Sequence, residues 1–322
     1  MGTNIDKPTV ISTFAGTGGS SLGYHWAGFK ELLAIDFDAH AVECFKLNFP
    51  DVPVWHKSVT DVTGKQIMDF TGLKWGELDV FDGSPPCQGF STAGKRQVTD
   101  PRNDLFMQYC RLISELGPKV FVMENVSGMA KGVMKGAFIE IVKSLKCMNY
   151  VVKCKQMNAM YYGVPQSRQR IIFIGVRKDL GKMPQFPVPS NKLVTVSQAF
   201  AQIKDVGYIP PRTPTRSNQW ADETPMGRSH PRHFSILKLH AHKPANTIPK
   251  SVAVNGACQV LHPLLKRVCT INEIKALCSF PQDWKLTGTF AQQWSRLGNA
   301  VMPKFMQAIA ETIKTEILDI PD

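Results

Sequence analysis

The chain has 322 residues, of which 43% are hydrophobic and 20% are charged, and its formal net charge is +12. This composition predicts a substantial core, in one large domain or two smaller ones. The basic excess favours nucleic acid as a partner, although a generally basic protein without such a partner has the same composition. No apolar run is long enough for a membrane span, and the first ten residues, MGTNIDKPTV, lack the basic and apolar parts of a signal peptide.

The eight cysteines are scattered along the chain and form no C-x-x-C pair. Zinc sites and dithiol redox motifs usually contain such pairs, so we expect no metal site. A chain with a core of this size does not need disulfides, which favours a reducing compartment. We therefore expect a cytoplasmic protein.

Short apolar runs alternate with helical patterns through the first half of the chain. The expected buried strands are 9–14, 31–35, 78–81, 119–124 and 170–176. The expected amphipathic helices are 39–47, 105–116 and 137–145. This alternation predicts βαβ units and an α/β fold with a doubly wound, mostly parallel, Rossmann-like sheet. Such sheets bind ligands beyond the carboxyl ends of their strands.

The composition changes after residue 176. Residues 177–256 contain ten of the 22 prolines and twelve Lys or Arg against four Asp or Glu, an excess of 12 − 4 = +8. We interpret them as a separate, irregular, basic module. Regular helix is expected again at 271–277 and 300–318, the latter with one apolar face at Val301, Phe305, Ile309 and Ile313.

A glycine-rich loop follows the first expected strand. Gly16, Gly18 and Gly19 let the backbone approach a ligand closely, and Asp36 stands 20 residues after Gly16, where an acid binds the ribose of an adenosine cofactor. The dinucleotide pattern requires a third glycine or an alanine where Ser21 stands, so S-adenosylmethionine, which has no phosphate, is the better fit. The alternative is a tight strand-to-helix turn that binds no ligand.

Reactive side chains stand at other strand ends of the same half. Cys87 follows two prolines, Glu124 and Asn125 end a strand, and Arg168 and Arg170 precede another. Each has an ordinary structural interpretation when taken alone. Together they provide a nucleophile, an acid and two cations, which suits addition of a thiolate to C6 of cytosine to activate C5. Arginine always carries its protons and can donate to the O2 atom.

The motifs resemble, in order, those of the cytosine-C5 DNA methyltransferases of bacteria and phages. The matching segments are FAGTGG, IDF (35–37), GSPPCQGFS, DPRNDLF (100–106), MENV (123–126), QSRQR (166–170), RVCTINE (267–273) and LGNAVMPKF (297–305). The resemblance covers nearly the whole chain. It implies a bacterial or phage-encoded enzyme that transfers a methyl group from S-adenosylmethionine to C5 of a flipped cytosine in duplex DNA.

The resemblance also implies roles for individual residues. Cys87 would attack C6, Glu124 would contact N3 and N4, Arg170 would face O2, and Arg168 would support the loop or the flipped nucleotide. The cofactor residues would be Phe14, Gly16, Gly18, Gly19, Asp36, Phe37, Ser58, Val59, Pro85, Leu105, Asn299, Ala300 and Val301. The usual adenine-binding Asp is replaced by Ser58, so Ser58, Asp61 or the Val59 backbone would take its place.

The resemblance further implies a domain division. Residues 1–182 and 291–322 would form the catalytic and cofactor-binding domain, 183–265 the target-recognition domain, and 266–290 a hinge segment. The expected DNA contacts are Gln88, Ser91, Asn125, Arg212, Arg216 and Arg228, with Asn218 and Gln219 as further candidates. We expect a monomer that acts on double-stranded DNA, with a separate restriction endonuclease as a possible cognate protein.

Two alternatives remain open at this point. One is a tRNA-directed relative with the same fold, which usually carries Cys-Phe-Thr where this chain has CSFP (278–281). The other is an inactive homologue that only binds DNA or a protein. Such homologues typically lose the Pro-Cys or Glu-Asn-Val residues, and both are present here.

Overall fold

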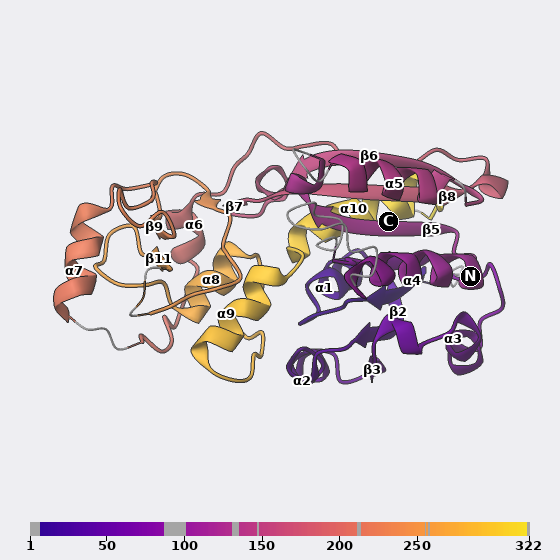
Figure 1. Ribbon diagram of the computed structural model, residues 1–322, viewed down its shortest axis with the longest axis horizontal. Helices are drawn as coiled ribbons and strands as arrows, with labels where there is room; N and C mark the ends of the chain where they lie inside the picture. The colour runs from indigo at the N-terminus through magenta and orange to yellow at the C-terminus, as the bar shows by residue number, and fades with distance from the viewer. Residues whose placement is uncertain are drawn as a thin grey trace, which may run out of the picture. The chain divides into compact units, whose positions relative to one another are not determined.

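A computed structural model describes residues 7–86, 101–130, 135–146, 148–210, 214–254, 256 and 258–320 (Figure 1). The chain divides into two compact units. The first unit comprises Met1–Met157, Gln169–Val188 and Met306–Asp322, and the second comprises Asn158–Arg168 and Pro189–Phe305. Within the described residues, no helix has the length and apolar character needed to cross a membrane.

The first unit is built on a seven-stranded sheet with the order β3-β2-β1-β4-β5-β8-β6. Its strands are β1 (Thr9–Thr13), β2 (Lys30–Asp36), β3 (Val54–His56), β4 (Val80–Gly83), β5 (Val120–Val126), β6 (Tyr150–Asn158) and β8 (Gln169–Arg177). The five strands from β3 to β5 are parallel, whereas β8 runs antiparallel to β5. The predicted doubly wound, mostly parallel α/β sheet is confirmed.

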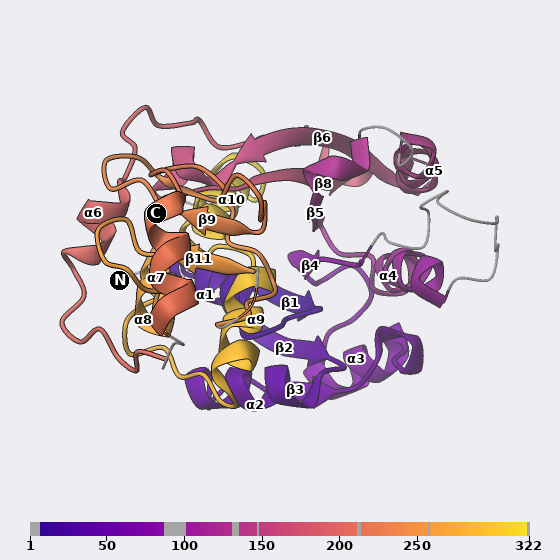
Figure 2. The same cartoon turned by 60° about the vertical axis from the view of Figure 1, so that its left-hand side comes forward.

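Helices cover both faces of this sheet (Figure 2). One face carries α3 (Gly64–Thr71), α4 (Pro101–Leu116) and α5 (Lys135–Lys146), and the other carries α1 (Gly19–Trp26), α2 (Ala39–Asn48) and α10 (Pro303–Glu316). The core on the α4 side joins Ile11 and Phe81 of the sheet to Phe106 of the helix, all essentially inaccessible to solvent. Short 3-10 helices span Val59–Asp61, Ser127–Ala130, Ala159–Tyr162 and Lys178–Leu180.

Local sequence explains where several helices begin. The Asp38 carboxylate accepts the backbone N–H groups of His40 and Ala41 and so caps α2. The helix predicted at 300–318 begins three residues later than expected, at Pro303. Proline is favoured at a first helical position because it has no N–H to leave unpaired. Val301 therefore precedes the helix.

A close contact sets the pairing of β5 with β8. Phe121 lies directly opposite Gly175 in the antiparallel ladder. A Cβ atom at Gly175 would overlap the Phe121 ring, so the ring packs over the bare glycine backbone. The same register pairs Glu124 with Ile172 and Val126 with Arg170.

The second unit consists of short elements joined by long connections. Its helices are α6 (Val196–Phe200), α7 (Pro214–Glu223), α8 (Ile271–Leu277) and α9 (Phe290–Asn299). Its strands form two parallel pairs, β7 (Gln166–Ser167) with β10 (Ala245–Asn246), and β9 (Ile236–Lys238) with β11 (Gln259–Leu261).

Two turns of the second unit are built in the same way, each around a histidine followed by proline. The Nδ1 atom of His230 accepts the N–H groups of Arg232 and His233, both at 3.1 Å, and its Nε2 lies 2.9 Å from a Glu223 oxygen. Likewise, His262 Nδ1 accepts two following N–H groups, and its Nε2 faces Glu273. A ring nitrogen that accepts hydrogen bonds carries no proton. Both turns therefore require the tautomer in which Nδ1 is the acceptor and the proton is on Nε2.

Candidate active site

A pocket of about 120 Å³ opens beside the carboxyl ends of β1 and β2. The strand order reverses at β1, which lies between β2 and β4, and open α/β sheets bind ligands at such a reversal. The pocket is lined by Phe14, Ile35, Asp36, Phe37, Lys57, Ser58, Val59 and Leu105. Six of these eight were predicted from sequence, namely all except Ile35 and Lys57.

The glycine loop between β1 and α1 adopts backbone conformations that few residues tolerate. Gly16 and Gly18 have φ angles of +57° and +91°, and Phe14 has +55° without being a glycine. A Cβ atom at Gly18 would lie 2.7 Å from the Phe49 ring, so a side chain is excluded there. Unusual φ values in non-glycine residues concentrate at functional sites, and the Phe14 ring lines the pocket.

Asp36 holds this loop in place. One carboxylate oxygen accepts the Gly16 N–H at 2.7 Å and the other accepts the Asp38 N–H at 2.8 Å. The residue is 8% exposed. A carboxylate group accepts several hydrogen bonds at once, and Asp36 is one of the residues that line the pocket.

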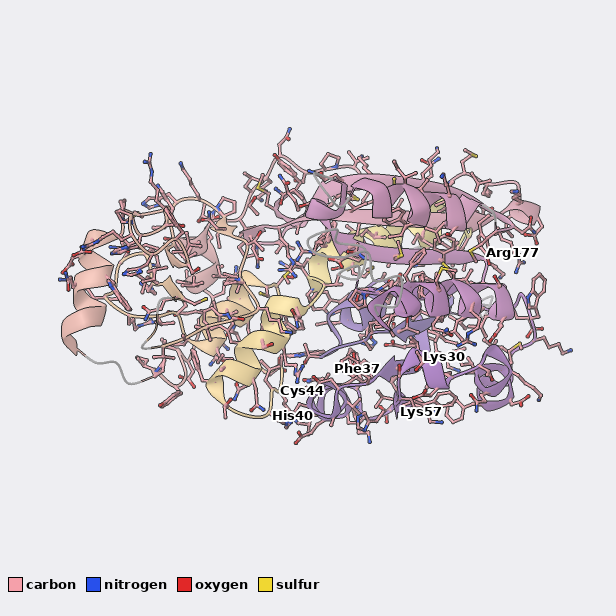
Figure 3. The ribbon with its side chains drawn as sticks, viewed as in Figure 1. Lys30, Phe37, His40, Cys44, Lys57 and Arg177 are labelled. Carbon is pink, nitrogen blue, oxygen red and sulfur yellow. The ribbon has the colours of Figure 1, made fainter. Side chains whose placement is uncertain are left out.

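The next residue after Asp36, Phe37, contributes an exposed aromatic ring to the pocket lining. Phe37 is labelled in Figure 3. It is 68% exposed, and its carbonyl oxygen lies 3.0 Å from His56 Nε2. A large apolar side chain left in water at a concave site is available to stack on a flat ligand. Figure 3 also labels Lys57, which lies over the Trp55 ring, 5.0 Å from its centre.

The Ser58 segment forms the opposite wall. The Ser58 hydroxyl oxygen accepts the Thr60 N–H and so caps a short 3-10 helix, and it lies 2.8 Å from the Thr60 hydroxyl oxygen. Ser58 and Val59 line the pocket, whereas Asp61, the other candidate for the adenine contact, is not among the lining residues. Asp61 instead accepts the Thr60 hydroxyl at 2.9 Å.

The backbone that leads to Cys87 is tied to the neighbouring strand. Asn125 Nδ2 donates to the Pro85 carbonyl at 2.9 Å, and its Oδ1 accepts the Val126 N–H. Pro85 and Asn125 are both buried. Asn125, predicted from sequence as a DNA contact, thus fixes the last described backbone before Cys87, the predicted nucleophile. Cys87, Gln88 and Ser91 themselves lie outside the described residues.

Glu124 and Arg170 form an ion pair at the same edge of the sheet. Arg170 Nε lies 2.6 Å from Glu124 Oε1, and the two side chains are 13% and 12% exposed. The Arg170 Nη1 atom also donates to the Gln169 carbonyl at 2.8 Å. A largely desolvated, charge-assisted contact of this kind fixes both groups in orientation. The sequence predicted both residues, and the structure brings them together.

Arg168 belongs to the second unit and is 4% exposed. Its Nη2 atom donates to the carbonyl of Gly298 at 2.9 Å. Gly298 is packed so closely that a Cβ atom would lie 2.5 Å from the Pro249 carbonyl oxygen. Arg168 therefore supports the turn that carries three predicted cofactor residues, Asn299, Ala300 and Val301.

The predicted DNA contacts of the second unit differ in how far they are described. Arg228 is exposed and lies on a hairpin. Two backbone hydrogen bonds close the hairpin: the Lys238 N–H donates to the Arg228 carbonyl, and the Gly227 N–H donates to the Lys238 carbonyl. Arg212 lies outside the described residues, and Arg216 lies on α7 with its side chain not described. Residues 227–243 contain four Lys or Arg and no Asp or Glu.

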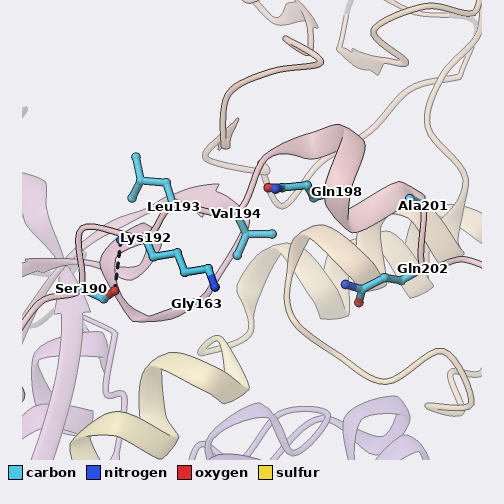
Figure 4. A pocket seen from close by; sticks show the side chains of 8 residues that line it. All are labelled: Gly163, Ser190, Lys192, Leu193, Val194, Gln198, Ala201 and Gln202. Carbon is cyan, nitrogen blue, oxygen red and sulfur yellow. Dashed lines mark hydrogen bonds between the residues drawn. The ribbon is translucent and has the colours of Figure 1, made fainter.

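A larger pocket, of about 580 Å³, lies in the second unit between the 190–194 segment and α6 (Figure 4). Lys192 supplies its charged group, and the Lys192 N–H donates to the Ser190 hydroxyl at 3.1 Å. Among the described residues that line it there is no Asp, Glu, His or Cys. Among the described residues, no group of three or more His, Cys, Asp or Glu is arranged to hold a metal ion.

Sequence comparison identifies relatives along the whole chain. The profile of the C-5 cytosine-specific DNA methylases matches residues 8–315. The type II methyltransferase M.XorII of Xanthomonas oryzae pv. oryzae is 31% identical, over 99% of this chain and 87% of that protein. M1.HphI of Haemophilus parahaemolyticus, also a type II methyltransferase, is 34% identical, over 95% and 86% of the two chains.

Solved structures share the fold. A crystal structure described as a DNA modification methyltransferase encoded within a prophage, from E. coli, has a TM-score of 0.80 at 24% identity and covers 97% of this chain and 100% of its own. The DNMT2 structure from Spodoptera frugiperda has a TM-score of 0.70 at 19% identity, covering 96% and 99%. With the pocket at the sheet's reversal point, the matched profile and these type II relatives, the chain belongs to the C-5 cytosine-specific DNA methylases and is a DNA (cytosine-5-)-methyltransferase of restriction-modification type.

Proposed function

We propose that the pocket of the first unit binds S-adenosylmethionine, which supplies the methyl group for transfer. The observation that carries this proposal is the lining, where a buried carboxylate, Asp36, stands beside an exposed aromatic ring, Phe37, and apolar walls. The carboxylate suits ribose hydroxyls and the ring suits an adenine face. The loop at Gly16 and Gly18 lets backbone approach the rest of the cofactor.

Cys87 would act as the nucleophile on an extruded cytosine. Its thiolate adds to C6, and the electron pair of the C5–C6 bond becomes available at C5. C5 then takes the methyl group, and removal of the C5 proton by a base expels the thiolate and restores the ring. The bond from Asn125 to Pro85 supports this role because it fixes the backbone two residues before the thiol.

Glu124 would assist the addition of the thiolate by acting at N3 of the cytosine. The developing negative charge on the ring is relieved by a proton or strong hydrogen bond at N3, and a carboxyl group there contributes about 10²–10⁴ in rate. Arg170 holds that carboxylate at 2.6 Å and has remaining donors for O2 of the cytosine. Arg168 would support the turn at Gly298, which precedes the predicted cofactor residues Asn299, Ala300 and Val301.

The second unit would read the DNA sequence, with 183–265 as the target-recognition domain and 266–290 as a hinge segment. The proposed DNA contacts in this unit are Arg228, on its hairpin, Arg212 and Arg216. Phosphate contacts supply affinity, and the few side chains that reach base edges supply specificity. We propose that the protein acts on duplex DNA as a monomer. A cognate restriction endonuclease, where one exists, would be a separate chain.

Mechanism-based trapping tests the proposal. Fluorine at C5 cannot leave as a cation, so the methylated adduct of 5-fluorocytosine should stay attached to the enzyme. We expect wild-type protein with cofactor to give a denaturant-resistant complex with substituted duplex DNA, and a peptide map to place the adduct at Cys87. The Cys87→Ser variant should give no complex because a serine hydroxyl is hardly ionised at neutral pH. An adduct on another cysteine would contradict the mechanism, and trapping on tRNA but not on DNA would change the substrate.

A further inference from the structure

A buried carboxyl group lies between the glycine loop and the segment that leads to the nucleophile. Asp82 is the third residue of β4 and is 4% exposed. Its Oδ2 accepts the Ser20 hydroxyl at 2.6 Å, and its Oδ1 accepts the Tyr24 hydroxyl at 3.3 Å. Ser20 and Tyr24 lie one turn apart on α1 and are 7% and 0% exposed. One carboxyl group thus binds the first turn of α1 to the end of β4.

The backbone on both sides of this contact has little freedom to move. The Asp82 carbonyl accepts the Thr13 hydroxyl at 3.0 Å, which ties β4 to the last residue of β1. A Cβ atom at Gly83 would lie 2.5 Å from both Thr13 Oγ1 and the Tyr109 ring. Asp82 is therefore a fixed point, and the position of α1 relative to β4 depends on its two hydroxyl partners.

We infer that Asp82, through Ser20, is a positioning residue for methyl transfer, which keeps the glycine loop and residues 82–86, the segment that leads to Cys87, in a single relative arrangement. The inference rests on the proposed function of the pocket and of Cys87. Ser20 directly follows Gly19, the last residue of the glycine loop, and Pro85 stands three residues after Asp82. A shift of α1 along β4 would therefore change the geometry between donor and acceptor, where displacements near 1 Å are costly.

The charge state of Asp82 controls the strength of this connection. Burial raises the pKa of Asp82 from 3.8 to about 7, against the lowering effect of the Ser20 and Tyr24 hydroxyls. Ionised, the carboxylate accepts charge-assisted bonds; protonated, it accepts weaker neutral ones. The other titratable groups that face it are Tyr24, Tyr109, Glu124 and Glu31. The two tyrosines have raised pKa values and stay neutral, whereas burial raises the pKa of Glu31 to about 8.

The chain contains a matched control for Ser20. Its neighbour Ser21 is also buried on the first turn of α1, and its hydroxyl donates to Glu31 Oε1 of β2 at 2.9 Å. Ser20→Ala and Ser21→Ala thus each remove one hydroxyl group bound to a buried carboxyl group. Of these two serines, Ser20 is the one that connects α1 to the strand that leads to Cys87, where the Tyr24 hydroxyl makes the second contact with Asp82. A merely structural role predicts the same effect for both variants.

The experiment measures S-adenosylmethionine binding by calorimetry, melting temperature without ligand, and the rate of trapping on 5-fluorocytosine DNA at pH 6 and pH 8. At pH 8 we expect Ser20→Ala to bind the cofactor about tenfold more weakly, the size of a lost charge-assisted hydrogen bond, and to trap more slowly, with Ser21→Ala within about twofold of wild type. Wild-type affinity should fall from pH 8 to pH 6, and Asp82→Asn should remove that fall.

The possible failures are distinct. Failure of the wild-type protein to bind the cofactor would refute the proposed function itself. Equal cofactor affinity and trapping rate in Ser20→Ala and Ser21→Ala, with a normal wild type, would refute the positioning role of Asp82. If Asp82→Asn does not fold, the two serine variants still decide the question, because each removes a single oxygen atom and leaves both carboxyl groups in place.

Discussion

The guanidinium of Arg170 and the carboxylate of Glu124 approach to 2.6 Å across two antiparallel strands, with both side chains nearly buried. Such a pair holds the acid in one orientation, at the price of desolvating both charges. Each partner therefore depends on the other, and removal of one leaves an uncompensated charge at the proposed site of chemistry.

Glu124→Gln keeps the shape of the side chain and removes its acidity. We expect single-turnover methyl transfer to slow by about 10²–10⁴, the contribution of a positioned general acid. Cofactor affinity should be unchanged, because Glu124 is not among the residues that line the cofactor pocket. A rate within about threefold of wild type would show that N3 needs no acid here.

Arg170→Lys tests geometry at constant charge. Lysine lacks the planar fork of arginine, so the contact with Glu124 should loosen and single-turnover rate should fall, although net charge is preserved. Circular dichroism would verify the fold. Full activity of the lysine variant would mean that only the positive charge matters.

Asp36→Ala should weaken S-adenosylmethionine binding much more than DNA binding. The ribose hydroxyls would lose a charged acceptor, about 1.5–3 kcal/mol, or roughly tenfold or more in Kd. Asp38→Ala is the matched control: it removes the cap of α2, at about 1 kcal/mol of stability, two residues further on. If both variants bind the cofactor equally, Asp36 serves only the backbone of the loop.

Glu31 should make the protein less stable as pH rises. Burial raises its pKa from 4.5 to about 8, so between these values the folded chain holds a proton that the unfolded chain releases. By linkage, the stabilising effect of that proton is complete below pH 4.5 and is lost as pH rises through 8. We expect Glu31→Gln to flatten the fall of melting temperature between pH 5 and pH 8. If the melting temperature of Glu31→Gln falls with pH as steeply as that of the wild type, Glu31 does not have the raised pKa that its burial implies.

Arg228→Ala should weaken DNA binding about equally on all sequences if Arg228 contacts phosphate, with the slope of log K against log salt reduced by about one. If it contacts a base edge, the loss should be confined to the cognate sequence. Lys65→Ala, an exposed cation on α3 of the first unit, serves as control. Fluorescence anisotropy over a salt series distinguishes these results, and an unchanged affinity would remove Arg228 from the interface.

Sequence patterns predicted β1, β2, β4, β5 and β8 but not β3 or β6. Motifs predicted six of the eight residues that line the pocket, because glycines and an acid at strand ends are local signals. The helices α3 and α9 were not predicted, and they are only eight and ten residues long. Both have a capping box, at Thr63 with Gln66 and at Thr289 with Gln292, which would have located their first residues. Lys57 on the pocket wall and the bond from Asn125 to Pro85 depend on which strands are neighbours, which no local pattern contains.

The pairing of Phe121 with the bare backbone of Gly175 has a consequence far from its own position. Both faces of β8 are buried, so alternation of apolar residues cannot define which neighbours its residues meet. The Phe121 ring fits only over a residue without a side chain, so its packing on Gly175 selects one register of the two strands. That register places Arg170 beside Glu124. Adding a single methyl group at Gly175, five positions from the arginine, should therefore damage chemistry at the opposite end of the strand.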